Sequence, residues 1–259
     1  MPVSPSAFFN WRSNRTIIDI RPAYVFMKGS FPGAISFASE KFHSPANLFE
    51  CLVKMHFPAP VHLIDTDGSI ATHVPTHNNF DFLEGGYRAY QQWRDHIYAV
   101  GPPVGIISGK TGSGKTELLR QLEKTGRQVI DLEALAMHKG SAFGGLETAQ
   151  PPIEQFQYAI AKAWLSLNPA LPVWMEDKGP LLGKAGIPAT LYQRMANACL
   201  FELDLPFEKR LLHIKEEYSG VDKKWFRTCI KELEKRMGFS ANHKALHFHE
   251  TGQVDKCLG

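Results

Sequence analysis

The segment Gly109–Thr116, which reads Gly-Lys-Thr-Gly-Ser-Gly-Lys-Thr, constrains the fold more than any other feature of the chain. It fits the pattern G-x-x-x-x-G-K-[ST] at every fixed position. The short apolar run Val104–Ile107 precedes it, and the helix-length segment Lys115–Lys124 follows it. In such a strand–loop–helix context, backbone N–H groups surround phosphate oxygens and the helix N-terminus favours anions. The pattern therefore predicts a P-loop that binds a nucleotide or another diphosphate-bearing ligand; a glycine-rich turn without a ligand is the alternative.

The pattern also assigns roles within the loop. The Lys115 ammonium supplies a positive charge to the terminal phosphates, and the Thr116 hydroxyl is suited to Mg²⁺. The expected ligand-binding residues of this segment are Gly109, Thr111, Gly112, Ser113, Gly114, Lys115 and Thr116.

Acidic residues follow two further apolar runs. Val173–Met175 ends at Glu176 and Asp177, a pattern typical of a strand whose carboxylates hold a metal ion or its water. We expect both acids in the ligand site and Asp177 to hold Mg²⁺ with the P-loop threonine, although solvated acids at a strand end are the alternative. Asp131 and Glu133 follow another run, at the sheet edge where ligands bind in open α/β folds. Asp131 is a candidate base or substrate-positioning residue, or a helix N-cap.

Two more segments carry candidate anion contacts. Residues 138–145, His-Lys-Gly-Ser-Ala-Phe-Gly-Gly, combine glycines, cations and a hydroxyl, which suits a loop closing over an anion. Lys139 and Ser141 are its candidate ligand contacts, and a surface turn is the alternative. Pro206–Tyr218 is a predicted helix whose Arg210 is either a contact for a transferring phosphate or a solvated charge.

The chain alternates short apolar runs with helix-length segments in both halves, which predicts βαβ units and parallel sheets. Gly101, Pro102 and Pro103 interrupt this alternation. We therefore expect two α/β domains, residues 1–99 and 100–259. The expected strands are 16–20, 60–64, 104–107, 128–130, 173–175 and 199–203, and the expected helices include 45–55, 87–98, 115–124, 152–165, 190–197 and 206–218.

Composition places the chain among proteins with a packed core, since 44% of its 259 residues are hydrophobic and 21% are charged. The net charge of +3 is compatible with a nucleic-acid partner without arguing for one. The sequence has no apolar stretch of spanning length and no signal-peptide pattern, so a soluble, cytoplasmic protein is expected. Its oligomeric state is not indicated. The spacing of the four cysteines predicts no metal site. For the cluster His243, His247 and His249, an exposed tail is favoured over a metal site.

Several motifs together resemble a known family. Residues 18–21 (Ile-Asp-Ile-Arg), 29–35 (Gly-x-x-Pro-Gly-Ala-Ile) and 83–89 (Leu-Glu-Gly-Gly-Tyr-Arg-Ala) resemble the motifs of a rhodanese domain. The P-loop half adds the segment at 138–144 and Pro-Phe-Glu-x-Arg-Leu at 206–211. In this order the motifs are similar to those of tRNA 2-selenouridine synthase, patchily over residues 16–98 and almost continuously over 104–218.

This resemblance implies an N-terminal rhodanese-like parallel sheet and a C-terminal sheet of the P-loop NTPase type. It implies a transferase that modifies the wobble uridine of certain tRNAs. That family exchanges the sulfur of 2-thiouridine for selenium from selenophosphate, through an S-geranyl intermediate made from geranyl diphosphate. A tRNA partner and a P-loop ligand, either geranyl diphosphate or ATP or GTP with Mg²⁺, are therefore implied here.

The sequence departs from the family pattern at three places. The rhodanese nucleophile should be a cysteine after the strand at 60–64, and this position holds Asp65, which cannot form a persulfide or perselenide. The segment Ser36–Pro58 is shortened and rewritten, and the C-terminal extension is reduced to a short tail. We expect selenium transfer to be lost and ligand binding at the P-loop to be retained.

Three alternatives remain open from the sequence. The chain is a P-loop kinase if Lys115, Thr116, Asp131, Asp177 and Arg210 form a kinase set, and a nucleotide-binding regulator if its rhodanese half is only a scaffold. A third interpretation comes from residues 61–69, where an apolar strand followed by Asp-Thr-Asp-Gly-Ser is typical of haloacid-dehalogenase-type phosphatases. A turn that replaces a lost active site explains the same residues.

Overall fold

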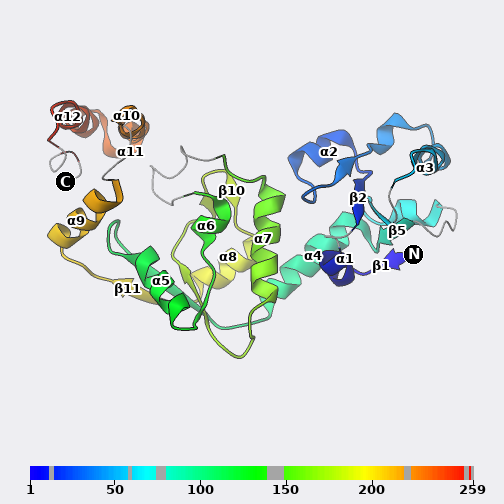
Figure 1. Ribbon diagram of the computed structural model, residues 1–259, viewed down its shortest axis with the longest axis horizontal. Coiled ribbons are helices and arrows are strands. Elements are labelled where there is room, and N and C mark those ends of the chain that lie inside the picture. The colour runs from blue at the N-terminus through cyan, green and yellow to red at the C-terminus, as the bar shows by residue number, and fades with distance from the viewer. Residues whose placement is uncertain are drawn as a thin grey trace. The chain divides into compact units, whose positions relative to one another are not determined.

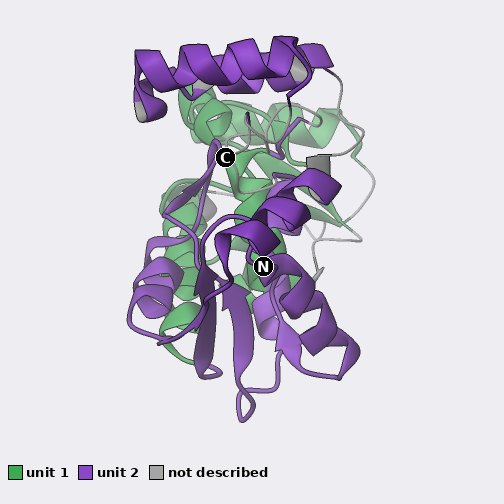
Figure 2. Ribbon diagram, turned by 90° about the vertical axis from the view of Figure 1, so that its left-hand side faces the viewer, with its two compact units in different colours: residues 1–100, 152–161 green, residues 101–151, 162–259 purple. Residues whose placement is uncertain are grey.

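The computed structural model of the chain describes residues 1–11, 15–57, 60–73, 80–138, 149–218, 223–253 and 257. The chain divides into two compact units, shown in different colours in Figure 2. Unit 1 contains Met1–Val100 and Pro152–Ala161, and unit 2 contains Gly101–Pro151 and Lys162–Gly259. Helix α7 (Ile153–Leu165), one continuous helix in Figure 1, therefore contributes most of its length to unit 1.

Unit 1 is built around a parallel sheet. Within the described residues this sheet has five strands in the order β1-β5-β4-β2-β3, and every neighbouring pair is parallel. The prediction of a parallel α/β fold in this half is confirmed. Its strands are β1 (Pro2–Val3), β2 (Thr16–Asp19), β3 (Ile35–Ser36), β4 (Val61–Ile64) and β5 (Phe80–Leu83); its helices are α1 (Pro5–Trp11), α2 (Ala23–Lys28), α3 (Pro45–Lys54) and α4 (Gly86–Ala99), with 3-10 turns η2 (Ser39–Lys41) and η3 (Ser69–His73).

Helix α3 packs against the sheet of unit 1. Ser44 caps it by accepting a hydrogen bond from the Asn47 N–H at 3.3 Å, which satisfies one of the unpaired amides of the first turn. The helix is amphipathic, and its apolar residues pack with those of β2, β4 and β5 into one core. The members of this core are Ile18, Ile20, Leu48, Phe49, Leu52, Val61, Leu63 and Phe80. Cys51 lies on the exposed side of the helix.

A buried ion pair links α4 to the beginning of α7. The Arg94 Nη1 atom lies 3.1 Å from Glu154 Oε2, and the two side chains are 7% and 13% exposed. These residues are 60 positions apart in the chain, so the contact exists only in the folded unit. Because a charge removed from water needs a partner, this pair ties residues 152–161 to unit 1.

Unit 2 contains a second parallel sheet, with the order β11-β6-β8-β7 among the described residues. Strands β9 and β10 form a separate antiparallel hairpin. The strands are β6 (Val104–Gly109), β7 (Gln128–Val129), β8 (Val173–Glu176), β9 (Leu181–Leu182), β10 (Ala185–Gly186) and β11 (Cys199–Leu203); the helices are α5 (Lys115–Lys124), α6 (Leu132–Ala136), α8 (Ala189–Ala196), α9 (Phe207–Tyr218), α10 (Lys223–Glu232), α11 (Glu234–Met237) and α12 (Phe239–Glu250). Each strand and helix expected for this half is present, with small differences at the ends.

The pairing of β6 with β8 positions the site. Ile107 of β6 lies opposite Glu176 of β8 in a parallel register. The carboxyl ends of both strands therefore meet at one edge of the sheet, where the P-loop begins at Gly109. This is the edge at which open α/β sheets bind ligands.

The C-terminal helices α10 and α12 pack through the buried side chains of Phe226, Ile230 and Ala245. His243, His247 and His249 all lie on α12. Within the part of the chain that the structure describes, no three His, Cys, Asp or Glu side chains are grouped so that they would hold a metal ion. No described helix combines the length and apolar content that a membrane crossing requires.

Candidate functional site

The P-loop turns on glycines that no other residue replaces easily. Gly112 has a φ of +77°, a conformation that L-residues rarely adopt. A Cβ atom at this position would lie 2.5 Å from the backbone oxygen of Arg210 and 2.8 Å from Ile214 Cγ1. The loop therefore needs glycine here both for its backbone shape and because α9 approaches it closely. Gly114 ends the loop as the N-cap of α5.

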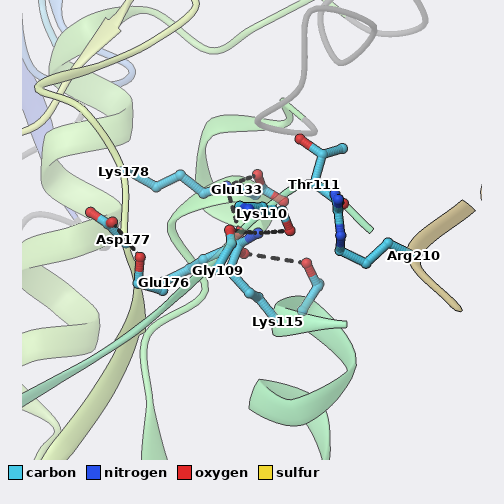
Figure 3. A network of polar contacts seen from close by, with 11 residues as sticks. Gly109, Lys110, Thr111, Lys115, Glu133, Glu176, Asp177, Lys178 and Arg210 are labelled. Carbon is cyan, nitrogen blue, oxygen red and sulfur yellow. Dashed lines mark hydrogen bonds and ion pairs between the residues drawn. The ribbon is translucent and has the colours of Figure 1, made fainter. Parts of the chain in front are cut away.

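Lys115 is folded over the loop that precedes it. Its ammonium donates to the Gly109 carbonyl at 2.8 Å and to the Lys110 carbonyl at 3.2 Å. The same Nζ atom lies 3.7 Å from Glu176 Oε1, with the two side chains 14% and 8% exposed (Figure 3). These contacts hold the positive charge at the mouth of the loop, where a phosphate would bind.

The carboxylate beside the P-loop threonine belongs to Glu176. The Thr116 hydroxyl donates to Glu176 Oε2 at 3.3 Å. Asp177, which we expected to hold Mg²⁺ with Thr116, instead accepts a hydrogen bond from the Ser108 hydroxyl at 2.8 Å. Successive residues of a strand point to opposite faces, so only one of two adjacent acids faces the threonine. The two acids thus have different partners, and Glu176 rather than Asp177 is the acid in contact with Thr116.

Asp131 is the N-cap of helix α6, one of the two roles expected for it from the sequence. Its Oδ1 atom accepts the Ala134 N–H at 2.9 Å. The neighbouring Glu133 contacts the ammonium of Lys178, a residue that the sequence analysis missed. A cation two positions beyond the strand-ending Glu176 is the signal that points to Lys178, because that position lies at the same sheet edge.

Helix α9 lies against the P-loop through two side chains. Arg210 Nη1 donates to the Thr111 carbonyl at 3.1 Å, and His213 Nδ1 lies 2.8 Å from the Gly112 carbonyl. Arg210 is therefore neither a fully solvated charge nor distant from the site, and its guanidinium lies beside the loop (Figure 3). His213 was not expected at the site from the sequence. Lys139 and Ser141, the other expected contacts, lie outside the described residues.

The loop after β4 is filled by its own aspartate. Asp65 Oδ1 accepts the Gly68 N–H at 2.7 Å and Oδ2 accepts the Ile70 N–H at 2.9 Å. The residue is only 7% exposed, and a Cβ atom at Gly86 would lie 2.5 Å from its Oδ1 atom. Burial raises the pKa of Asp65, while the two amide hydrogen bonds oppose that rise. Its carboxylate is engaged and enclosed, an arrangement that does not favour the phosphatase interpretation, in which it would attack phosphorus.

Comparison with known proteins decides the family. The model of the tRNA 2-selenouridine synthase AAA domain matches residues 102–259, which is more than half of the chain. The chain belongs to the tRNA 2-selenouridine synthase family. The family expectation from the sequence is therefore confirmed for the P-loop half, while residues 1–101 lie outside the matched range.

Curated tRNA 2-selenouridine synthases show the same relationship. The chain is 34% identical over 165 residues to the protein from Shewanella loihica, which covers 62% of this chain and 42% of that one. It is 38% identical over 143 residues to the protein from Proteus mirabilis, covering 54% and 38%. It is 34% identical over 184 residues to the protein from Shewanella piezotolerans, covering 69% and 48%. The matches thus span less than half the length of these tRNA 2-selenouridine synthases.

Proposed function

We propose that this chain binds the diphosphate group of a small ligand, geranyl diphosphate or a nucleotide, at the P-loop and acts on or binds tRNA that carries wobble 2-thiouridine. The observation that carries the proposal is the convergence of Lys115, Thr116 and Glu176 at one sheet edge, in the unit that matches the family. If Lys115 binds the ligand, Lys115→Ala removes most of the affinity for diphosphates, which calorimetry measures.

Mg²⁺ fits the oxygen atoms that this site offers. The Thr116 hydroxyl and the Glu176 carboxylate lie 3.3 Å apart, and hard oxygen donors of this kind are what Mg²⁺ prefers. We infer that these two residues hold the ion with the ligand's phosphate oxygens. When bound, the ion neutralises phosphate charge.

We also propose that unit 1 is a rhodanese-like domain that no longer transfers selenium. In support, its sheet is wholly parallel, and the loop after β4 adjoins the start of α4, where the Tyr87 N–H donates to the Asp65 carbonyl at 2.9 Å. A rhodanese-type loop surrounds a thiolate with backbone amides. Here a carboxylate takes two such amides, and it has no sulfur to carry a selenium atom.

Asp65→Ala is expected to lower the free energy of unfolding by about 1 to 3 kcal/mol, because the partly buried amides of Gly68 and Ile70 lose their acceptor. Asp67→Ala is the matched control. Asp67 is exposed and accepts the Ser69 N–H at 3.0 Å, so its loss is expected to cost under about 1 kcal/mol. Urea denaturation of both variants measures the difference. Equal stabilities would mean that Asp65 does not hold the loop.

An exposed row of cations on α10 supports the tRNA partner. Lys223, Lys224, Arg227 and Lys231 are all exposed, whereas Phe226 lies in the core of the C-terminal helices. Lys223, Arg227 and Lys231 follow one another at intervals of four residues, which corresponds to about 6 Å along the helix. Among the described residues, Arg227 is the only member of this row that forms an ion pair with an acidic side chain, Glu250 at 3.0 Å. The row therefore suits a phosphate backbone.

The triple variant Lys223→Ala, Lys224→Ala and Lys231→Ala is expected to weaken tRNA binding and to reduce the dependence of log K on log salt concentration by about 2, since each lost phosphate contact removes roughly 0.7 to 0.9. Fluorescence anisotropy at several salt concentrations measures both effects. The control variant replaces the exposed Lys28, Lys41 and Lys124, and its slope should match that of the wild type. A wild-type affinity that does not change with salt would contradict the tRNA proposal.

A P-loop kinase or a nucleotide-binding regulator is the competing function. The same three residues, Lys115, Thr116 and Glu176, suit ATP with Mg²⁺, so the site geometry favours neither ligand. Lys115-dependent binding of ATP without binding of geranyl diphosphate would support this second function.

A further inference from the structure

A second ammonium group lies beside Lys115 in the P-loop site. The Lys178 Nζ atom donates to Glu176 Oε1 at 2.8 Å and also to Glu133 Oε1. Lys115 Nζ lies 3.7 Å from the same Glu176 Oε1 atom. Since 2.8 Å and 3.7 Å to a shared atom allow at most 6.5 Å between them, the two ammonium groups are close neighbours (Figure 3).

Two carboxylates from different elements hold Lys178 in this position. Glu133 comes from α6 and Glu176 from the end of β8. The side chains of Lys178, Glu133 and Glu176 are 11%, 15% and 8% exposed, so the charges are largely withdrawn from water and depend on one another. The cation is thus held at the ligand-binding edge of the sheet.

We propose that Lys178 is a second diphosphate-binding cation, held ready beside Lys115 by Glu133 and Glu176; this inference rests on the proposed diphosphate-binding function. An ammonium group has three N–H donors, and in the described structure these two carboxylates take two of them. The third remains for a phosphate oxygen. A diphosphate carries its charge on two adjacent phosphate groups, which two neighbouring ammonium groups match better than one.

Lys178 contacts only one of the two Glu176 carboxylate oxygens and leaves the other beside the Thr116 hydroxyl. Lys178 contacts Glu176 through Oε1, whereas the Thr116 hydroxyl faces Oε2. One carboxylate thus serves both groups through different oxygens. Lys178 therefore adds to the cations of the site without replacing the Thr116 and Glu176 oxygens.

The test is calorimetric titration with inorganic diphosphate. Lys178→Met is expected to bind it at least about tenfold more weakly than the wild type, because a charge-assisted contact is lost. Lys184→Met is the matched control, since Lys184 is an exposed lysine of the β9–β10 turn, and its affinity should stay within about twofold of the wild type. Thermal unfolding of each variant verifies that it is folded.

A second pair of variants separates a ligand contact from a counter-ion role. Glu133→Gln and the double variant Lys178→Met/Glu133→Gln differ only by Lys178. The double variant keeps the net charge of the wild-type cluster, and its remaining carboxylate, Glu176, still has Lys115 Nζ at 3.7 Å. If Lys178 contacts the diphosphate, the double variant stays at least about tenfold weaker than Glu133→Gln. Recovery of wild-type affinity in the double variant would overturn the proposal. A wild type that binds no diphosphate would instead refute the proposed function itself, and the role of Lys178 with it.

Discussion

Arg94→Met is expected to lower the free energy of unfolding of unit 1 by about 3 to 5 kcal/mol. The substitution keeps much of the apolar stem of the side chain but removes the guanidinium that pairs with Glu154 at 3.1 Å. The Glu154 carboxylate, whose side chain is 13% exposed, would then remain buried without its cation. Urea denaturation followed by circular dichroism measures the loss.

Two controls make this result specific. Arg88→Met changes an exposed arginine of the same helix and is expected to alter stability by no more than about 0.5 kcal/mol. The double variant Arg94→Met/Glu154→Gln removes both charges and should regain much of the lost stability. If Arg94→Met were as stable as Arg88→Met, residues 152–161 would not be anchored in unit 1 by this pair.

The second large effect is expected at the P-loop. Gly112→Ala should weaken diphosphate binding by at least about 100-fold, which corresponds to about 3 kcal/mol. The new Cβ would lie 2.5 Å from the Arg210 backbone oxygen, so either α9 or the loop must move. The positive φ of +77° adds strain of about 1 to 2 kcal/mol. Calorimetry with inorganic diphosphate measures the change.

Gly126→Ala is the matched control for this substitution. Gly126 has a similar φ of +81°, but a Cβ atom there would meet nothing within 4 Å. It therefore carries the same backbone strain without a steric clash, and its affinity for diphosphate should be unchanged. Equal affinities of the two variants would show that the close approach of α9 does not matter for binding.

Local patterns were sufficient to predict the framework of the site. The P-loop glycines, the apolar runs and the helix-length segments depend on neighbouring residues alone, and the strand β6, the helix α5 and both parallel sheets are found where they were expected. The family followed from the order of short motifs, which the match over residues 102–259 confirms.

The choice between adjacent acids needed the structure. Whether Glu176 or Asp177 faces Thr116 depends on the register of β8 against β6, and a slip of one residue would exchange the two faces. The sequence alone does not fix that register. Lys178 was missed because its contacts with Glu133 and Glu176 join residues from two elements, which the sequence alone does not bring together.

Contacts between distant segments were also beyond the sequence. Arg210 reaches the Thr111 carbonyl across 99 positions of the chain, and Arg94 reaches Glu154 across 60. Periodicity identifies the buried face of a helix but not the element against which that face packs. The inclusion of residues 152–161 in unit 1, where a single boundary near residue 100 was expected, has this origin.

The most direct test of the central claim is a calorimetric titration of the wild type and of Lys115→Ala with geranyl diphosphate and, separately, with ATP and Mg²⁺. We predict that the wild type binds at least one of these ligands and that Lys115→Ala weakens the binding by about 100-fold or more. Binding of geranyl diphosphate alone would support tRNA modification, and binding of ATP alone would support the kinase or regulator. Absence of binding to either ligand, or equal affinity of Lys115→Ala and the wild type, would contradict a diphosphate site at the P-loop.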